Sequence, residues 1–262
     1  MKKGICIGSL PGGSTEARFK LAKEAGFDGV EIGTLENNDD RLQTKEIATQ
    51  HGVEVFSVMN SKHWGCPLSD ADADVRAESR DGMLDSIATA SAVGADAVLL
   101  VPAVVNDKTS YEDAYQRSQV EIRKLIPEAK AKNITIALEN VWNKFLLSPI
   151  EFCRYLDEFD SETITAYFDV GNIVLYGYPQ HWIRSLGHRI SKVHIKGFNA
   201  TESRWTYLIE DCTIDWNAVM SALEEIGYDD YMTAELSVDE DDPEGRVHSI
   251  SSDMDEIIAG NV

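Results

Sequence analysis

Short apolar segments alternate along the chain with longer segments of mixed, helix-like composition. The apolar segments are rich in Val, Ile, Leu and Phe and almost continuously hydrophobic, as is typical of parallel strands that are covered on both faces. We expect eight of them to be strands, at residues 4–10, 29–33, 54–60, 97–102, 135–140, 165–172, 191–197 and 231–237.

The segments between these strands carry the start and stop signals of helices. Several begin at Ser, Thr or Asp and end at Gly or Asn, which are the residues that cap helix termini. Pro149 and Pro179 fit the first turn of two further helices. The clearest helical patterns cover residues 14–26, 73–94, 110–133 and 215–227.

Eight strands, each followed by a helix-like segment, predict an α/β protein with a (β/α)₈ TIM barrel, formed as a single domain over residues 1–262. A doubly wound open sheet is the main alternative. Its glycine-rich phosphate turn is missing, because the first strand is followed by GSLPGGST rather than GxGxxG. The acidic run at residues 239–245 is expected to be a solvated loop after the eighth strand.

Charge and cysteine content narrow the partners and the compartment. The net charge of −21 repels phosphate backbones, so we expect no nucleic-acid partner. The apolar run near the N-terminus is interrupted by glycines and is too short for a signal peptide or a membrane span. The four cysteines form no CxxC and are expected to be free thiols in a reducing compartment, so we predict a cytoplasmic protein without a membrane partner.

Four consecutive predicted strands end in side chains that bind metal ions: Glu139, Asp169, His194 and Glu235. The active site of a TIM barrel lies at the carboxyl ends of its strands, so these groups can meet at one centre. Three carboxylates brought together would repel each other unless a cation bound them. Any one of the four alone is more simply a core histidine or a solvated strand end. Together they favour one divalent ion, with Mn²⁺, Mg²⁺ or Co²⁺ suited to oxygen and imidazole ligands and Zn²⁺ left open.

Further side chains are candidates for binding a substrate near these strand ends. His63 and Trp64 follow the third strand, and the indole can either stack on the ring of a bound ligand or merely close the barrel. Lys196 lies two residues after His194 and on the same side of its strand. Glu31, near the end of the second strand, can polarise a substrate hydroxyl or support a ligand. Weaker candidates are Arg76, Trp142, Asn143, Arg204 and Trp205.

Several motifs across nearly the whole chain resemble the xylose isomerase-like TIM barrel superfamily. This group includes sugar isomerases, ketose 3-epimerases, inosose dehydratases and endonuclease IV. The motifs are specific for the superfamily and do not select one member. They are GFDGVEIG (26–33), SKHWGCPLSD (61–70), ALEN (137–140), FDVGN (168–172), VHIKG (193–197) and TIDWNAVMSALEEIGYDDY (213–231).

The resemblance implies that Glu139, Asp169, His194 and Glu235 are the metal ligands, and that Glu139 and Glu235 also act as acid and base on opposite faces of a bound sugar. It therefore implies a metal-dependent sugar isomerase or epimerase of carbohydrate metabolism, acting on a sugar or keto-sugar through proton transfer and a cis-enediolate intermediate. An inosose dehydratase-like lyase and a non-catalytic carbohydrate-binding barrel are the alternatives.

Two positions depart from the ketose 3-epimerases of the group. These enzymes carry a His and a second Glu where this chain has Asn172 and Phe145, which counts against a ketose 3-epimerase. We place Asn172 among the residues that contact a substrate. Endonuclease IV needs many more histidines than the six present. No phosphate cradle is evident, so we expect a small, unphosphorylated sugar as the partner, and the sequence leaves a homo-oligomer open.

Overall fold

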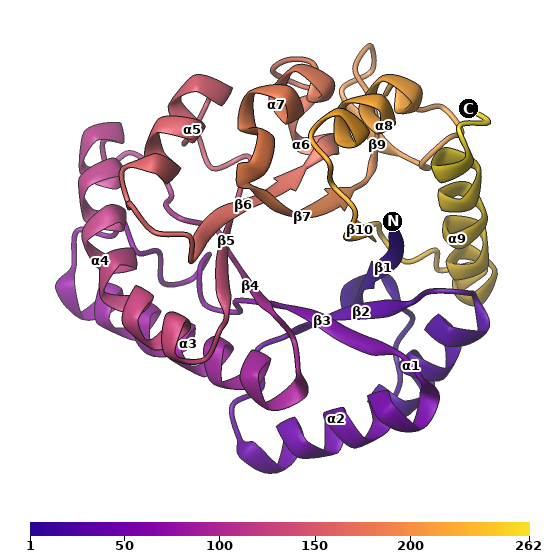
Figure 1. Cartoon of the computed structure of the whole chain (residues 1–262), viewed down its shortest axis with the longest axis horizontal. Helices are drawn as coiled ribbons and strands as arrows, with labels where there is room; N and C mark the ends of the chain where they lie inside the picture. The colour runs from indigo at the N-terminus through magenta and orange to yellow at the C-terminus, as the bar shows by residue number, and fades with distance from the viewer. The chain divides into compact units, whose positions relative to one another are not determined.

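The computed structural model describes residues 1–262 and has the predicted α/β barrel. Its strands hydrogen-bond into a closed barrel in the order β1-β10-β7-β6-β5-β4-β3-β2 (Figure 1). The barrel strands are β1 (Lys2–Cys6), β2 (Gly29–Gly33), β3 (Glu54–Met59), β4 (Ala97–Leu100), β5 (Thr135–Glu139), β6 (Ile164–Asp169), β7 (Ile190–Ile195) and β10 (Tyr231–Ala234).

The helices follow the predicted start signals. Ser148 accepts a hydrogen bond from the Glu151 backbone N–H, and Pro149 and Pro179 both lie in the first turn of a helix, as predicted. None of the helices is both long and apolar enough to cross a membrane. The helices are α1 (Thr15–Glu24), α2 (Asn38–His51), α3 (Ala73–Val93), α4 (Tyr111–Ala131), α5 (Pro149–Asp157), α6 (Val170–Ile173), α7 (Pro179–Leu186), α8 (Trp216–Glu225) and α9 (Pro243–Ala259), with short 3₁₀ turns at Ile7–Ser9 and Gly187–Arg189.

Several strands end earlier than the apolar runs predicted. The run at 4–10 leaves β1 after Cys6 and continues as a 3₁₀ turn. The run at 165–172 leaves β6 after Asp169, because the Asp169 side chain caps α6. After β7 the chain forms an antiparallel hairpin, β8 (Gly197–Asn199) and β9 (Arg204–Thr206), that the sequence did not indicate.

The acidic run at 239–245 is a loop only in part. Asp242 accepts a hydrogen bond from the Gly245 backbone N–H, and Pro243 begins α9. Aspartate and proline at a helix start supply the cap and the pre-set backbone angle, so the last three residues of the run are helical. The prediction of a loop was therefore wrong for residues 243–245.

The chain forms two compact units. Unit 1 contains Met1–Glu31, Glu46–Val55 and Phe168–Val262. Unit 2 contains Ile32–Lys45 and Phe56–Tyr167. The single-domain extent over residues 1–262 stays a prediction.

In unit 1 the strand registers place four chemically active side chains on one face. Cys6 of β1 pairs with Glu31 of β2, and Thr233 of β10 pairs with both His194 of β7 and Gly4 of β1. Partners in a parallel ladder point to the same face, and alternate residues of a strand share a face. Glu235, two residues after Thr233, therefore continues the face that carries Cys6, Glu31 and His194. Figure 1 shows β1 and β10 side by side.

In unit 2 the strands β4 and β5 are buried on both faces. Leu99 pairs with Ala137, and both belong to a buried cluster with Tyr167 of β6. The alternate residues Val98 and Ile136 are fully buried as well. Strands covered on both sides account for the continuous hydrophobic runs in the sequence.

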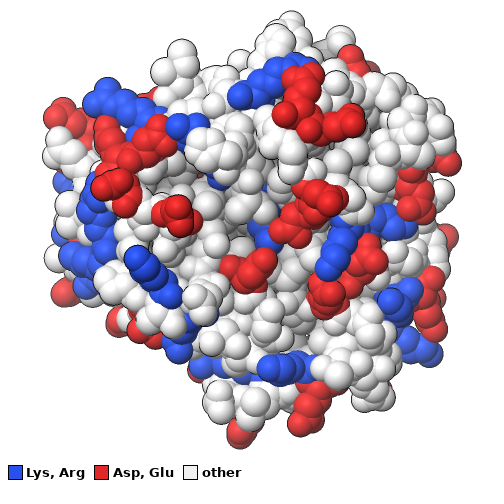
Figure 2. Space-filling view, in the orientation of Figure 1, with Lys and Arg blue, Asp and Glu red and all other residues white.

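Charged side chains of both signs are mixed on the surface. On the face drawn in Figure 2, acidic and basic groups lie interspersed among uncharged side chains, and basic groups form no broad patch there.

Candidate active site

Three of the four predicted metal ligands lie together in unit 1. Asp169 is the last residue of β6, His194 is the penultimate residue of β7, and Glu235 directly follows β10. The His194 Nδ1 atom lies 3.7 Å from Glu235 Oε2 and 4.0 Å from Asp169 Oδ2. Each of the three residues offers a ligand atom within 4.8 Å of the others. The structure therefore brings these three groups together at the strand ends, and their role as metal ligands stays a prediction.

Asp169 is held by the helix that follows it. Its Oδ1 accepts a hydrogen bond of 2.7 Å from the backbone N–H of Asn172, which makes Asp169 the N-cap of α6. The DVGN sequence thus uses one carboxylate oxygen for the cap. The other oxygen, Oδ2, is left on the side of His194 and Lys196.

Lys196 joins the two carboxylates of this cluster. Its Nζ lies 2.9 Å from Asp169 Oδ2 and donates a short hydrogen bond to Glu235 Oε2. The ammonium also lies 5.3 Å from the ring centre of Trp205 on β9, within the range of a cation–π contact. The hairpin after β7 therefore supports the lysine that was predicted to serve this site.

The two carboxylates have pKa values shifted in opposite directions. Complete burial raises the pKa of Asp169, and the nearby charges of Lys196 and His194 only partly offset it. Burial also acts to raise the pKa of Glu235, but the charges of His194 and Lys196 and the hydrogen bond from Lys196 together lower it. Carboxylates with diverging pKa values are frequent at catalytic sites, where one group holds a proton and its neighbour accepts one.

The donor set of this cluster fits a divalent cation. Two donors that each bind one Mg²⁺ or Zn²⁺ at about 2.1 Å lie at most about 4.2 Å apart, and both His194 Nδ1 distances satisfy this limit. When all three are ionised, as carboxylates that bind or face a cation are, Asp169, Glu235 and the nearby Glu31 carry three negative charges, and Lys196 returns one positive charge. The remaining negative charge, largely buried, matches a divalent ion with oxygen and imidazole ligands.

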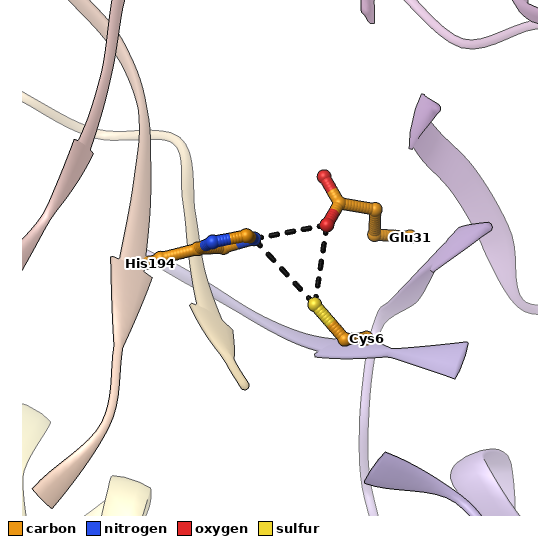
Figure 3. A group of neighbouring side chains, drawn as sticks. All are labelled: Cys6, Glu31 and His194. Carbon is orange, nitrogen blue, oxygen red and sulfur yellow. Dashed lines mark hydrogen bonds and ion pairs between the residues drawn. The ribbon is translucent and has the colours of Figure 1, made fainter. Parts of the chain in front are cut away.

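Cys6 and Glu31 contact the opposite edge of the same imidazole. His194 Nε2 lies 2.9 Å from Glu31 Oε1 and 3.5 Å from Cys6 Sγ, and the Sγ lies 3.1 Å from the same Oε1 (Figure 3). Burial and the Glu31 carboxylate raise the pKa of the Cys6 thiol well above its usual value. Glu31 was predicted at this site, but Cys6 was not. Cys6 ends β1, but the predicted strand continued to residue 10, so the sequence did not mark Cys6 as a strand end.

The fourth predicted ligand, Glu139, is the buried last residue of β5 in unit 2. It pairs with Tyr167 of β6, which lies two residues before Asp169. The role of Glu139 as a ligand stays a prediction.

His63 and Trp64, also in unit 2, follow β3 as predicted. The Val101 backbone N–H donates to His63 Nδ1 at 3.3 Å, so the buried imidazole ties this loop to the end of β4. The Trp64 ring packs edge-on against His63 and remains about half exposed. An exposed indole is available to stack on a ligand, which stays a prediction for this residue.

The remaining candidates have structural partners. Asn172 is buried in α6 and contributes its backbone N–H to Asp169. Phe145 is buried among Tyr111, Tyr115 and Tyr155, so its position supports the packing of unit 2. Arg76 pairs with Glu121 of α4, and the hairpin residue Arg204 pairs with Glu202 and Asp211.

Known proteins resemble this chain over most of its length. It is 26% identical to the L-ribulose-5-phosphate 3-epimerase UlaE of Escherichia coli (strain K12 / DH10B) over 206 residues, which cover 74% of this chain and 72% of UlaE. A solved structure of L-ribulose 3-epimerase matches with a TM-score of 0.83 at 20% identity, over 99% of this chain and 95% of the other. D-psicose 3-epimerase from Clostridium cellulolyticum H10, solved with D-tagatose, matches with a TM-score of 0.83 at 16% identity, over 98% and 99% of the two chains.

These likenesses bear on the argument from Asn172 and Phe145. Both departures counted against a ketose 3-epimerase, yet the sequence relatives carry that name. The structural matches show the same barrel fold. The family model for the xylose isomerase-like TIM barrel matches residues 19–253, and the chain belongs to this family.

Proposed function

We propose that the protein is a divalent-metal-dependent ketose 3-epimerase, with an L-ribulose-type sugar as the first candidate substrate. The observation that carries the proposal is the cluster of Asp169, His194 and Glu235 at the ends of three barrel strands, joined by Lys196. The relatives named as 3-epimerases make a ketose the preferred substrate. Whether the sugar is phosphorylated is decided by the experiment below.

The residues that would hold the cation are Asp169, His194, Glu235 and, from β5, Glu139. When bound, the cation would polarise the ketose carbonyl and acidify the hydrogen on the neighbouring carbon. The Glu235 carboxylate lies beside His194 and Lys196 at the end of β10, and we assign it to accept that proton. We assign Glu139 the complementary role of delivering a proton from the other face of the resulting cis-enediolate, which inverts the carbon.

The other predicted residues take part in binding. Lys196 can donate a hydrogen bond to a substrate oxygen in which negative charge develops. Trp64 offers an exposed aromatic face to the sugar, with His63 fixing its loop. Asn172 lies beside Asp169 and is assigned to the substrate.

The cysteines bear on the cellular compartment of the protein. None of the four cysteines forms a disulfide bond, which supports assigning the protein to a reducing cytoplasm. We assign it to carbohydrate metabolism because its proposed substrate is a ketose. A homo-oligomer stays a prediction, which light scattering of the purified protein measures directly.

Proton exchange on candidate sugars tests the function. The protein is supplied with Mn²⁺ in D₂O and incubated separately with L-ribulose 5-phosphate, L-ribulose, D-psicose and an inosose, and the products are followed by NMR. The proposal predicts the C3 epimer of at least one ketose, carrying deuterium at C3. Loss of water from the inosose without ketose epimerisation would assign a dehydratase. Binding of a sugar without exchange would assign a non-catalytic barrel.

A matched pair of variants separates chemistry from folding. Glu235→Gln removes the proposed base and should reduce turnover by a factor on the order of 10²–10⁴, the usual contribution of a general base. Glu240→Gln alters an exposed carboxylate of the following loop and should retain full activity. Equal activity in the two variants would remove Glu235 from the mechanism.

A further inference from the structure

The two ring nitrogens of His194 face different groups. Nδ1 faces Glu235 and Asp169, at 3.7 and 4.0 Å. Nε2 faces Glu31 Oε1 at 2.9 Å and Cys6 Sγ at 3.5 Å (Figure 3). The side chains of His194 and Glu31 are 0% and 1% exposed, so solvent does not replace either contact. The environment of the imidazole is therefore asymmetric.

The hydrogen-bond partners of the neutral His194 ring determine which of its two nitrogens carries the proton. An ionised carboxylate only accepts hydrogen bonds, so Glu31 requires a donor at Nε2. The Cys6 thiol lies 3.1 Å from the same Oε1 and donates to it as well. A neutral imidazole has one N–H, and placing it on Nε2 leaves the lone pair of Nδ1 facing Asp169 and Glu235.

The other tautomer would put two acceptors against each other. With the proton on Nδ1, the Nε2 lone pair would face Glu31 Oε1 at 2.9 Å inside a buried site. The Nε2–H tautomer also leaves Nδ1 facing carboxylate oxygens, but at 3.7 and 4.0 Å these lie beyond hydrogen-bond distance, so the 2.9 Å contact at Nε2 decides the tautomer. A proton on Nδ1 would also block the lone pair through which this nitrogen would bind a cation.

The strands β1 and β2 supply this support. Cys6 and Glu31 are register partners on neighbouring strands, so both side chains leave the same face at the same height. Neither strand provides one of the predicted metal ligands. A metal-bound histidine is commonly oriented by a carboxylate on its second nitrogen.

We propose that Glu31 is a positioning residue that holds His194 in the Nε2–H tautomer and fixes its ring, so that Nδ1 is presented to the same cation as Asp169 and Glu235. The Cys6 thiol steadies the Glu31 carboxylate by donating to its Oε1. The purpose of this arrangement rests on the proposed function, but the tautomer of His194 does not depend on turnover.

NMR of ¹⁵N-histidine-labelled protein tests the tautomer directly. The signals of His194 are identified by their loss in His194→Gln and are recorded in metal-free protein at a pH where the ring is neutral. The wild type should show a protonated Nε2 and an unprotonated Nδ1. Glu31→Ala should show a mixture of tautomers, while Glu31→Gln, whose amide oxygen still accepts, should retain more of the Nε2–H form.

Metal affinity provides the second measurement. Competition with a fluorescent chelator should give a Kd for Mn²⁺ that rises by about 10–100-fold in Glu31→Ala, the usual effect of removing such a partner. Glu121→Gln, which changes a buried glutamate between α3 and α4, is the matched control and should leave both the tautomer and the Kd unchanged.

The outcomes test the role of Glu31 independently of the proposed epimerase activity. A wild-type ring protonated on Nδ1, or identical tautomers in the wild type and Glu31→Ala, would overturn it even if a ketose is epimerised. The expected tautomers without any sugar turnover would leave Glu31 as a positioning residue and refute the epimerase. If Glu31→Ala fails to fold, the wild-type spectrum and Glu31→Gln still decide the result.

Discussion

Gly171 of α6 lies so close to Lys196 that a β-carbon at position 171 would be 2.8 Å from the Lys196 carbonyl oxygen and in collision with the Lys196 Cγ. The same β-carbon would lie 3.2 Å from the Trp205 ring. The glycine of DVGN is therefore needed for the space it leaves, because the chain directly after β7 brings Lys196 over it. This contact couples the backbone after Asp169 to the ammonium that joins Asp169 and Glu235.

Gly171→Ala should therefore displace Lys196 and reduce activity. Overpacking against a backbone atom that cannot move aside costs about 1–3 kcal/mol of stability. We expect kcat/KM to fall by more than the stability loss explains, because the lysine shifts from the two carboxylates. Steady-state kinetics and urea denaturation measure the two effects.

Gly12→Ala is the control for this substitution. A β-carbon at Gly12 has no neighbour within 4 Å. Its activity and its midpoint of unfolding should match those of the wild type. An active Gly171→Ala with unchanged kinetics would show that the close contact does not position Lys196.

Lys196→Met should strengthen metal binding and weaken catalysis. The ammonium contacts both Asp169 and Glu235, so it competes with any cation that those carboxylates bind. We expect Mn²⁺ to bind about 10-fold more tightly in the variant, a change of about 1.4 kcal/mol, while kcat falls. Lys20→Met, at an exposed position of α1, should change neither value. Weaker Mn²⁺ binding in Lys196→Met would contradict the competition.

Much of the barrel could be predicted from the sequence because its strands are apolar runs and its helices begin and end at capping residues. The strand at 29–33 matches β2 residue for residue, and the helix at 73–94 ends one residue after α3, at the capping Gly94. Strand ends were less predictable, since apolar residues continue into the turn after Cys6 and into α6. The hairpin strand Arg204–Thr206 is largely exposed and carries no apolar pattern at all.

The candidate site was predictable where a residue's own type and position in the sequence mark it. Asp169, His194 and Glu235 are polar groups at the ends of apolar runs, and this contrast identified them. Cys6 and Gly171 were missed because their importance comes from neighbours on other strands. Cys6 matters through its register partner Glu31, and Gly171 through the side chain of Lys196. Neither relation can be read before the strands are paired.

Removing and restoring a divalent ion should change both stability and activity. A ligand present at 100 times its Kd stabilises the folded state by about 2.7 kcal/mol, or roughly 5–10 °C in Tm for a chain of this length. Thermal unfolding after dialysis against a chelator, followed by addition of Mn²⁺, Mg²⁺, Co²⁺ or Zn²⁺, measures this shift. Asp169→Asn should lose most of it, and Asp107→Asn, in an exposed loop, should retain it. No shift with any of the four ions would contradict a metal site.

Glu121 is a buried glutamate away from the candidate site. Glu121 of α4 has a side chain that is 5% exposed and accepts from Arg76 and Arg80 of α3 and from Lys124. Burial acts to raise the pKa of Glu121, but the hydrogen bonds from these three cations outweigh it, so the pKa is lowered. Glu121→Gln should destabilise the protein by about 1.5–3 kcal/mol at pH 7, the range for hydrogen bonds to a charged group.

The sign of the pH dependence follows from this lowered pKa. A carboxylate with a folded pKa below its unfolded value of about 4.3 adds stability above that value and loses it as the pH falls through the folded pKa. The difference between the wild type and Glu121→Gln should therefore shrink from pH 7 toward pH 3, as measured by urea denaturation. Glu128→Gln, exposed on the same helix and paired only with Lys132 four residues on, should cost no more than about 0.5 kcal/mol. A difference for Glu121→Gln that stayed constant across this range would mean that packing of the side chain, rather than its charge, stabilises the contact between α3 and α4.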